Sequence, residues 1–312
     1  MAFKRHCLAL CLFLAALLCS AQQPASTQPP PAPGSPQDLV QQGQKLSRDG
    51  KQDEALALFQ HALEKSPNLF EAHLAAGAAL DLKGDYSQAR KHLKKAIDVA
   101  TPETKAQAMR NLAYSYAFEG KAHKALEIEK PLFDNRIQNA DWINAAGISN
   151  ELARIYLESG DLAQAYKWYK LGYETSDRKP DLSEADKNLW LFRWENAQAR
   201  IAARRGKAAE AQQHVAAAKA ALDKANNPDQ ARFYPYLTGY VAYYTGDYRT
   251  AIAELQKADQ HDPLVLALLG EAYEKSGNEA QAKDFYRKVL EINTHNPPNA
   301  FARPLARKKL GA

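Results

Sequence analysis

The stretch GDYSQARKHLKKAI, residues 84–97, recurs as GDYRTAIAELQKAD at residues 246–259 and more loosely as GKQDEALALFQHAL at residues 50–63. Each copy begins with a glycine, and apolar residues then follow at intervals of three and four. That spacing is typical of one face of an α-helix. A chain that repeats one helical segment at such distances is built from repeated structural units.

Two further positions accompany this glycine throughout the chain. An alanine stands five residues after it, and a small residue stands seven before it. Each unit is therefore expected to be a helix, a turn and a second helix, because a glycine readily ends a helix and small residues allow two helices to cross closely. The seven glycines are Gly50, Gly84, Gly120, Gly160, Gly206, Gly246 and Gly277.

A bulky residue usually follows nine positions after the glycine, as at Phe59 and Leu93, and a proline ends two of the units, at Pro67 and Pro263. This pattern resembles the tetratricopeptide repeat family, whose period is about 34 residues. Units one, two, six and seven match it well. The resemblance implies an all-α fold, a right-handed α-solenoid of about seven helix–turn–helix units over residues 37–297, with a concave and a convex face.

The middle units depart from the family pattern. Glu129 and Pro131 stand where a bulky residue and a helix are expected, so the second helix of unit three is predicted to stop early. Longer connections are expected around residues 131–141 and 174–184. The first helix of unit five is expected to be lengthened, beginning near Ser183.

Residues 298–312 predict a short basic capping segment broken at Pro304. Its charged side chains are expected on a solvated outer face, with contact to an anionic surface as the alternative. These side chains are Arg303, Arg307, Lys308 and Lys309.

Residues 1–21 are typical of a signal peptide, with a basic start and an apolar run that falls short of the roughly 20 residues needed to span a bilayer. They predict a secreted, periplasmic protein. The alternative is a lipid anchor at Cys19, which is the one route to a membrane that the sequence suggests. Residues 22–36 form a proline-rich linker, expected to be extended.

The composition favours a globular binding protein without chemistry of its own. Apolar residues make up 46% and charged residues 25%, and the net charge of +5 comes without the dense basic block that nucleic-acid binding would need. All three cysteines lie within residues 1–21, and no two histidines have metal-ligand spacing. We therefore expect no enzyme activity, no cofactor and no metal site.

Recognition is instead expected on the concave face, which the first helix of each unit lines in this architecture. Arginine and asparagine side chains suit an extended acidic peptide, and tyrosines add rigid contact area. The expected function is a protein–protein interaction scaffold or assembly factor of the bacterial cell envelope. The candidate groove residues are Arg110, Asn111, Tyr114, Asn150, Arg154, Arg193, Asn196, Arg200, Tyr236, Tyr240 and Tyr243.

Two alternatives remain open at this point. The arginines could pair with neighbouring acids such as Glu151, Glu158 or Glu195, and the tyrosines could fill space between helices. A tryptophan-rich middle could bind a glycan or cell-wall polymer, or it could pack against the longer connections. Its tryptophans are Trp142, Trp168, Trp190 and Trp194.

Overall fold

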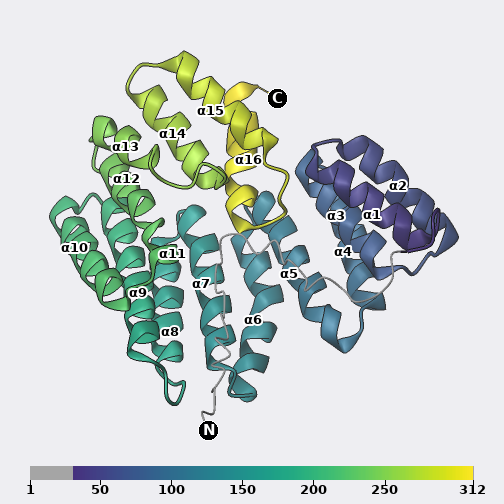
Figure 1. Ribbon diagram of the computed structural model, residues 1–312, viewed down its shortest axis with the longest axis horizontal. Coiled ribbons are helices and arrows are strands. Elements are labelled where there is room, and N and C mark those ends of the chain that lie inside the picture. The colour runs from purple at the N-terminus through teal and green to yellow at the C-terminus, as the bar shows by residue number, and fades with distance from the viewer. Residues whose placement is uncertain (1–30, 312) are drawn as a thin grey trace, which may run out of the picture.

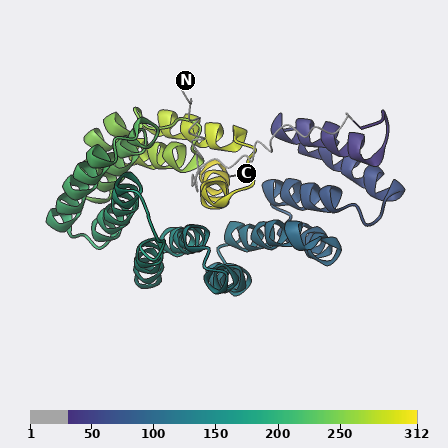
Figure 2. The ribbon, with the colours of Figure 1, turned by 60° about the horizontal axis from the view of Figure 1, so that its bottom comes forward.

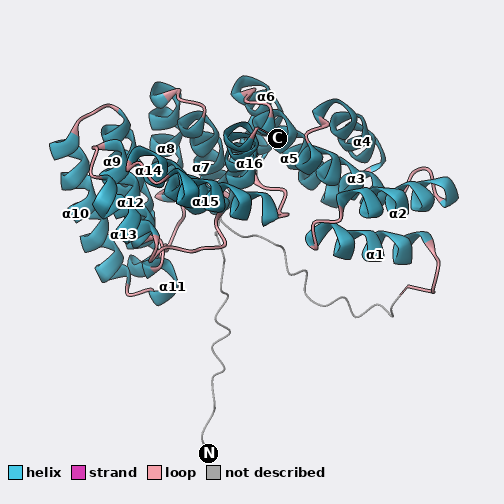
Figure 3. Cartoon of the chain, turned by 90° about the horizontal axis from the view of Figure 1, so that it is seen from above, coloured by secondary structure: helices cyan, strands magenta, loops and turns pink. Residues whose placement is uncertain are grey.

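Sixteen helices and no strand make up residues 31–311, the part of the chain that the computed structural model describes (Figures 1 and 3). The predicted signal segment, residues 1–21, lies outside the described residues. The helices are α1 (Pro36–Arg48), α2 (Gln52–Lys65), α3 (Phe70–Lys83), α4 (Tyr86–Val99), α5 (Pro102–Phe118), α6 (Ala122–Gln138), α7 (Trp142–Glu158), α8 (Leu162–Ser176), α9 (Glu184–Arg204), α10 (Ala208–Ala225), α11 (Pro228–Ala231), α12 (Tyr234–Tyr244), α13 (Tyr248–Leu255), α14 (Pro263–Lys275), α15 (Glu279–Glu291) and α16 (Pro297–Leu310).

The helices pair in sequence order, which confirms the α-solenoid. Units one to seven are the pairs α1–α2, α3–α4, α5–α6, α7–α8, α9–α10, α12–α13 and α14–α15, and each unit also packs on the next. The seven turn glycines all adopt a left-handed φ, between 72° and 91°. Residues with a Cβ rarely adopt this conformation, so the recurring glycine marks the end of each first helix.

The small residue before each turn accommodates the bulky residue of the second helix. A Cβ on Gly43 would lie 2.5 Å from Cε1 of Phe59, and a Cβ on Gly77 would lie 2.5 Å from Cγ of Leu93. Both distances are far below van der Waals contact. The small and bulky positions of the repeat are therefore two sides of one close helix crossing.

Two expectations about the middle units are wrong, and two are confirmed, since residues 177–183 do form a longer connection before α9. The second helix of unit three, α6, continues through Pro131 to Gln138, and no long connection occupies residues 131–138. Glu129 and Phe133 are both buried, so tertiary packing holds the helix on either side of the proline. The first helix of unit five, α9, is indeed lengthened, with Ser183 as its N-cap.

The C-terminal expectation is also corrected. Helix α16 is continuous through Pro304 rather than broken there. Its arginines point inward, since Arg303 is only 8% exposed and donates to the carbonyl oxygens of Leu82 and Leu290. Lys308 and Lys309 are both exposed to solvent as expected, and Lys309 also bonds to Glu274 of α14.

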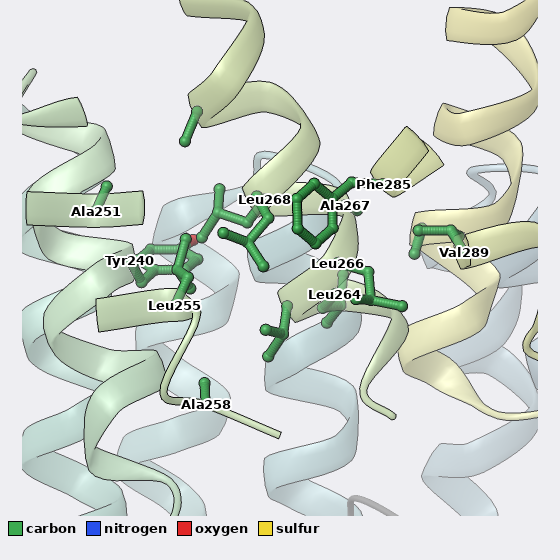
Figure 4. Packing of buried hydrophobic residues seen from close by; sticks show 14 of the residues in the cluster. Tyr240, Ala251, Leu255, Ala258, Leu264, Leu266, Ala267, Leu268, Phe285 and Val289 are labelled. Carbon is green, nitrogen blue, oxygen red and sulfur yellow. The ribbon is translucent and has the colours of Figure 1, made fainter. Parts of the chain in front are cut away.

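The solenoid curves into an arc whose two ends approach each other, and α16 lies inside it (Figure 2). There α16 contacts α5 and α7 as well as its sequence neighbours α14 and α15. Buried apolar side chains continue along the arc, and Figure 4 shows the cluster that joins α12 to α15, around Leu255, Leu266 and Phe285. The C-terminal helix thus fills part of the space that the arc encloses.

Candidate functional site: the inner face

The inner face is the concave surface of the arc, lined by the first helices of the units. All eleven predicted groove residues lie on such helices. Helix α5 carries Arg110, Asn111 and Tyr114, α7 carries Asn150 and Arg154, α9 carries Arg193, Asn196 and Arg200, and α12 carries Tyr236, Tyr240 and Tyr243. The structure divides them into two groups with different surroundings.

The α5 group is covered by the chain itself. Nδ1 of His295 lies 2.9 Å from Oδ1 of Asn111, and the His295 ring lies 5.8 Å from the ring of Tyr114. The other ring nitrogen of His295 donates to Asp81, 2.8 Å away, because a carboxylate can only accept. Asn111 and Tyr114 are therefore already in contact with a residue of the same chain.

Arg110 has a partner acid, as the structural alternative predicted. It forms an ion pair with Glu151 of α7, whose side chain is 4% exposed. Glu129 of α6 is fully buried nearby, and burial, together with the neighbouring Glu151, raises the pKa of its carboxyl well above the usual range. This shift in the pKa of Glu129 favours its neutral form, and the carboxylate that pairs with Arg110 is that of Glu151.

The α9 group surrounds a buried guanidinium. Arg200 is 4% exposed, and its Nη2 donates to the hydroxyl of Tyr169 at 3.0 Å. Its Nε and Nη1 have no hydrogen-bond partner among the described residues, and neither has the hydroxyl of Tyr240, whose ring lies 5.8 Å from the guanidinium carbon. Buried polar groups are nearly always hydrogen-bonded, so these donors mark an unfilled polar position.

Two more arginines lie in the same part of the inner face. Arg204 forms an ion pair with Glu158 of α7 at 2.8 Å and also donates to the carbonyl oxygen of Leu157. Arg154, one turn before Glu158, has a buried Nη1 without a partner in the described chain. We call Arg154, Arg200, Arg204, Tyr236 and Tyr240 the arginine–tyrosine cluster.

Asp262 approaches the cluster from the turn before α14. It is 5% exposed and caps that helix, with its Oδ1 accepting from the amide of Leu264 at 2.9 Å. Burial raises its pKa to about 6, although the positive charge of Arg154 opposes this shift. The turn that carries Asp262, DQHDP at residues 259–263, was not among the predicted sites. The residue before Pro263, at a helix start, was the signal for a buried N-cap.

The remaining predicted residues play packing roles. Oδ1 of Asn150 lies 2.5 Å from where a Cβ on Gly172 would stand, so the amide packs against the backbone of α8. Burial lowers the pKa of Arg193 to about 10, and its guanidinium lies over the ring of Trp190 at 4.6 Å. Tyr243 is half-buried, in edge contact with Tyr244.

The four tryptophans also pack rather than form a platform. Trp190 is 4% exposed, and Trp168 makes an edge contact with Phe133. Trp194 stacks on Tyr173, while Trp142 is covered by the guanidinium of Arg178 at 3.9 Å. The rings that glycan binding would need are thus engaged with protein.

Within residues 31–311 there is no group of three residues placed to hold a metal ion, and no helix is long and apolar enough to cross a membrane.

The sequence analysis did not predict one histidine pair that the structure brings together. Nδ1 of His73 lies 3.0 Å from Nδ1 of His92, and burial lowers the pKa of both. They stand 19 residues apart, so only the packing of α3 on α4 joins them.

Comparisons with known proteins agree with the repeat. Models of the tetratricopeptide repeat match residues 40–103 and residues 242–302. No curated protein matches the chain in sequence. Among solved structures, a tetratricopeptide repeat protein from Parabacteroides merdae is 12% identical, with a TM-score of 0.51 over 86% of this chain and 98% of that one. The apo form of RapI is also 12% identical, with a TM-score of 0.55 over 88% and 98%. At such identities the likeness is one of fold.

Proposed function

Because this chain is a tetratricopeptide repeat protein, we propose that it is a non-catalytic scaffold or assembly factor of the cell envelope that binds an extended acidic segment of another protein on its inner face. Solenoids of this kind bind partners on extended concave surfaces. Residues 1–21, with their signal-like sequence, support export to the periplasm, with a lipid anchor at Cys19 as the alternative.

The main support for an acidic ligand is the set of buried donors in the arginine–tyrosine cluster that have no acceptor among the described residues. Arg154 and Arg200 hold buried N–H groups without acceptors among the described residues, and Tyr240 holds such a hydroxyl. Carboxylates are the strongest acceptors that a protein partner offers to a guanidinium. A glutamate or aspartate side chain seated beside Arg200 would satisfy donors that are costly to leave unpaired.

The contact that His295, just before α16, makes with α5 also favours the arginine–tyrosine cluster as the binding surface. The α5 group is in contact with His295, whereas the predicted residues of α7, α9 and α12 face one another across the cluster. Within the cluster, Arg154 and Arg204 are partly exposed whereas Arg200, Tyr236 and Tyr240 are buried, so a partner is expected to reach the cluster through these two arginines. The ligand segment is expected to lie along α7, α9 and α12.

The test is peptide binding by the whole chain. A fluorescent decapeptide rich in aspartate and glutamate is titrated with parent protein, with Arg154→Gln, and with Arg249→Gln, whose side chain is exposed on α13. We expect Arg154→Gln to weaken binding at least tenfold and Arg249→Gln to leave it unchanged. Binding should also weaken as salt rises, since it is electrostatic.

Two results would contradict the acidic ligand. One is an acidic peptide that binds no better than a lysine-rich peptide of equal length. The other is equal binding by the parent and Arg154→Gln. A scaffold role would survive either result, with its partner surface elsewhere on the solenoid. Cell-envelope location is checked separately, by fractionation and N-terminal sequencing of the native protein.

A further inference from the structure

Helix α16 joins two parts of the arc that are far apart in sequence. On one side it packs against α14 and α15 of unit seven, and on the other against α5 and α7. Figure 2 shows it between the two arms of the arc. The contacts it makes on the two sides are chemically different.

Toward unit seven the contact is mainly apolar, with Lys309 bonded to Glu274 and Arg303 to the carbonyl oxygen of Leu290 at its edge. Ala302 and Ala306 are buried in the same cluster as Leu266 and Phe285, and Leu305 packs against that cluster. Exposing such side chains to water is unfavourable in proportion to their area. Helix α16 is therefore a fixed part of the C-terminal end of the solenoid.

On the other side, α16 makes polar bonds to α3 and an apolar contact with α5. Nε of Arg303 donates to the carbonyl oxygen of Leu82 at 2.8 Å, and Nη2 of Arg307 donates to the same oxygen at 3.0 Å. The last carbonyls of a helix have no intrahelical partner, and here the two arginines supply one for α3. Ala300 and Phe301 make the apolar part of this contact.

The segment before α16 adds side-chain bonds to the same units. His295 donates to Asp81 and stacks on Phe118, with ring centroids 5.4 Å apart. Asn293 lies 3.3 Å from the side-chain amide nitrogen of Gln52 in unit one. Residues 292–310 thus bond to units one, two and three while they remain packed on unit seven.

We propose that residues 292–310 are a clasp that holds the arc closed and controls access to the inner face of α3 and α5. Opening it separates α16 from α3 and α5 while α16 stays on α14 and α15. The polar groups released can bond to water, whereas the apolar packing on unit seven cannot be replaced in that way. Tyr114, which is 8% exposed, is fully accessible to a partner only in the open form. The clasp is independent of which ligand the arginine–tyrosine cluster binds.

The test uses two alanines of α16 that face its two sides. Cys7, Cys11 and Cys19 are replaced by serine, after which Ala300→Cys reports the side toward α5 and Ala302→Cys the side toward unit seven; both alanines are 1% exposed. Reaction with a maleimide is followed in the full chain. Each cysteine is also combined with Arg307→Ala, which weakens the clasp, or with Lys308→Ala, an exposed neighbour of equal charge.

We expect Arg307→Ala to speed the labelling of Ala300→Cys at least tenfold and to leave Ala302→Cys protected. Lys308→Ala should change neither rate. Acceleration of both cysteines together would overturn the proposal, because it would mean that α16 leaves as a whole or that the chain unfolds. Unchanged labelling of Ala300→Cys would overturn it as well.

A second measurement avoids any change at the contact with α5. Nitroxide labels on His61→Cys in α2 and Lys283→Cys in α15, both exposed, report the distance between the two arms of the arc. We expect one narrow distribution in the parent and an added longer population in Arg307→Ala. A single unchanged distribution in both would rule out the clasp.

Discussion

The two ends of the inner face use the same repeat position in opposite ways. On α5, Asn111 and Tyr114 are in contact with His295, so this end is filled by the chain itself. On α9 and α12, Arg200 and Tyr240 keep buried donors without partners in the described structure. A position that lines the concave face is therefore a binding position only where no other segment of the chain reaches it.

The cause of this difference is the curvature of the arc. Units one to three and the C-terminal segment are more than 180 residues apart, yet His295 and Asn293 hydrogen-bond to them. The α9 and α12 helices lie farther along the arc from those bonds (Figure 2). Substitutions in the two regions are therefore expected to change the free energy of unfolding in different ways.

The largest effect on stability is expected where α16 bonds to α3 and to unit seven. Arg303→Ala removes a donor for the carbonyl oxygens of Leu82, Leu290 and Ile292. Arg307 and Asn299 still donate to the oxygens of Leu82 and Ile292 in the variant, so only the Leu290 oxygen loses its side-chain donor altogether. Hydrogen bonds to charged groups contribute about 1.5–3 kcal/mol each, and the loss of three predicts a decrease of about 4 kcal/mol in the free energy of unfolding. Urea denaturation measures it, with Lys308→Ala as the control. A loss below about 1 kcal/mol would show that water replaces these bonds and that this region is held no more tightly than the arginine–tyrosine cluster.

The next effect is a pH dependence of stability at Asp262, which lies beside the arginine–tyrosine cluster. The pKa of Asp262 is raised to about 6, above its unfolded value of about 3.8, because burial disfavours the charged form. Its stabilising contribution is therefore complete below pH 3.8 and lost as pH rises through 6. Asp262→Asn keeps a helix-capping oxygen but cannot ionise.

Between pH 4 and pH 7.5, Asp262→Asn should gain about 3 kcal/mol relative to the parent, since one pKa unit corresponds to about 1.4 kcal/mol. Denaturation of both proteins at the two pH values gives this difference. A difference that is independent of pH would mean that Arg154 fully compensates the buried charge.

The smallest effect lies at the boundary between the two ends. Glu151→Gln leaves the half-exposed Arg110 without its partner and should cost about 2 kcal/mol. Glu129→Gln replaces a buried carboxyl whose raised pKa favours the neutral form with a neutral side chain of similar size, so stability should change by less than about 0.5 kcal/mol. Equal losses in thermal or chemical denaturation would show instead that both carboxyls are charged.

The fold was predictable because its determinants are local. The turn at Gly84 needs a left-handed φ, and the crossing at Gly77 needs room for Leu93, and both requirements recur at fixed spacing within one unit. The spacing of residues along the chain is therefore enough to identify tetratricopeptide repeats. The predicted helix breaks at Pro131 and Pro304 are wrong, because packing of the surrounding residues keeps both helices continuous.

The site was predictable only in part. Helical spacing correctly placed the eleven residues on the first helices of their units. The alternative that the arginines pair with neighbouring acids holds for Arg110 with Glu151, whereas Glu158 pairs with Arg204, which was not a candidate. It did not anticipate Asp262, Glu129 or the contact of His295 with Asn111. These residues meet through contacts between units that share no fixed spacing in the sequence.

The sequence by itself determined the repeated unit, the all-α solenoid and the helices that line its inner face, because each of these depends on residues within about 40 positions of one another. Only the tertiary structure decided which part of that face is covered and which arginines keep unpaired donors. Small rotations between successive units add up along the chain, and their sum brings α16 onto α5. No single repeat encodes that sum.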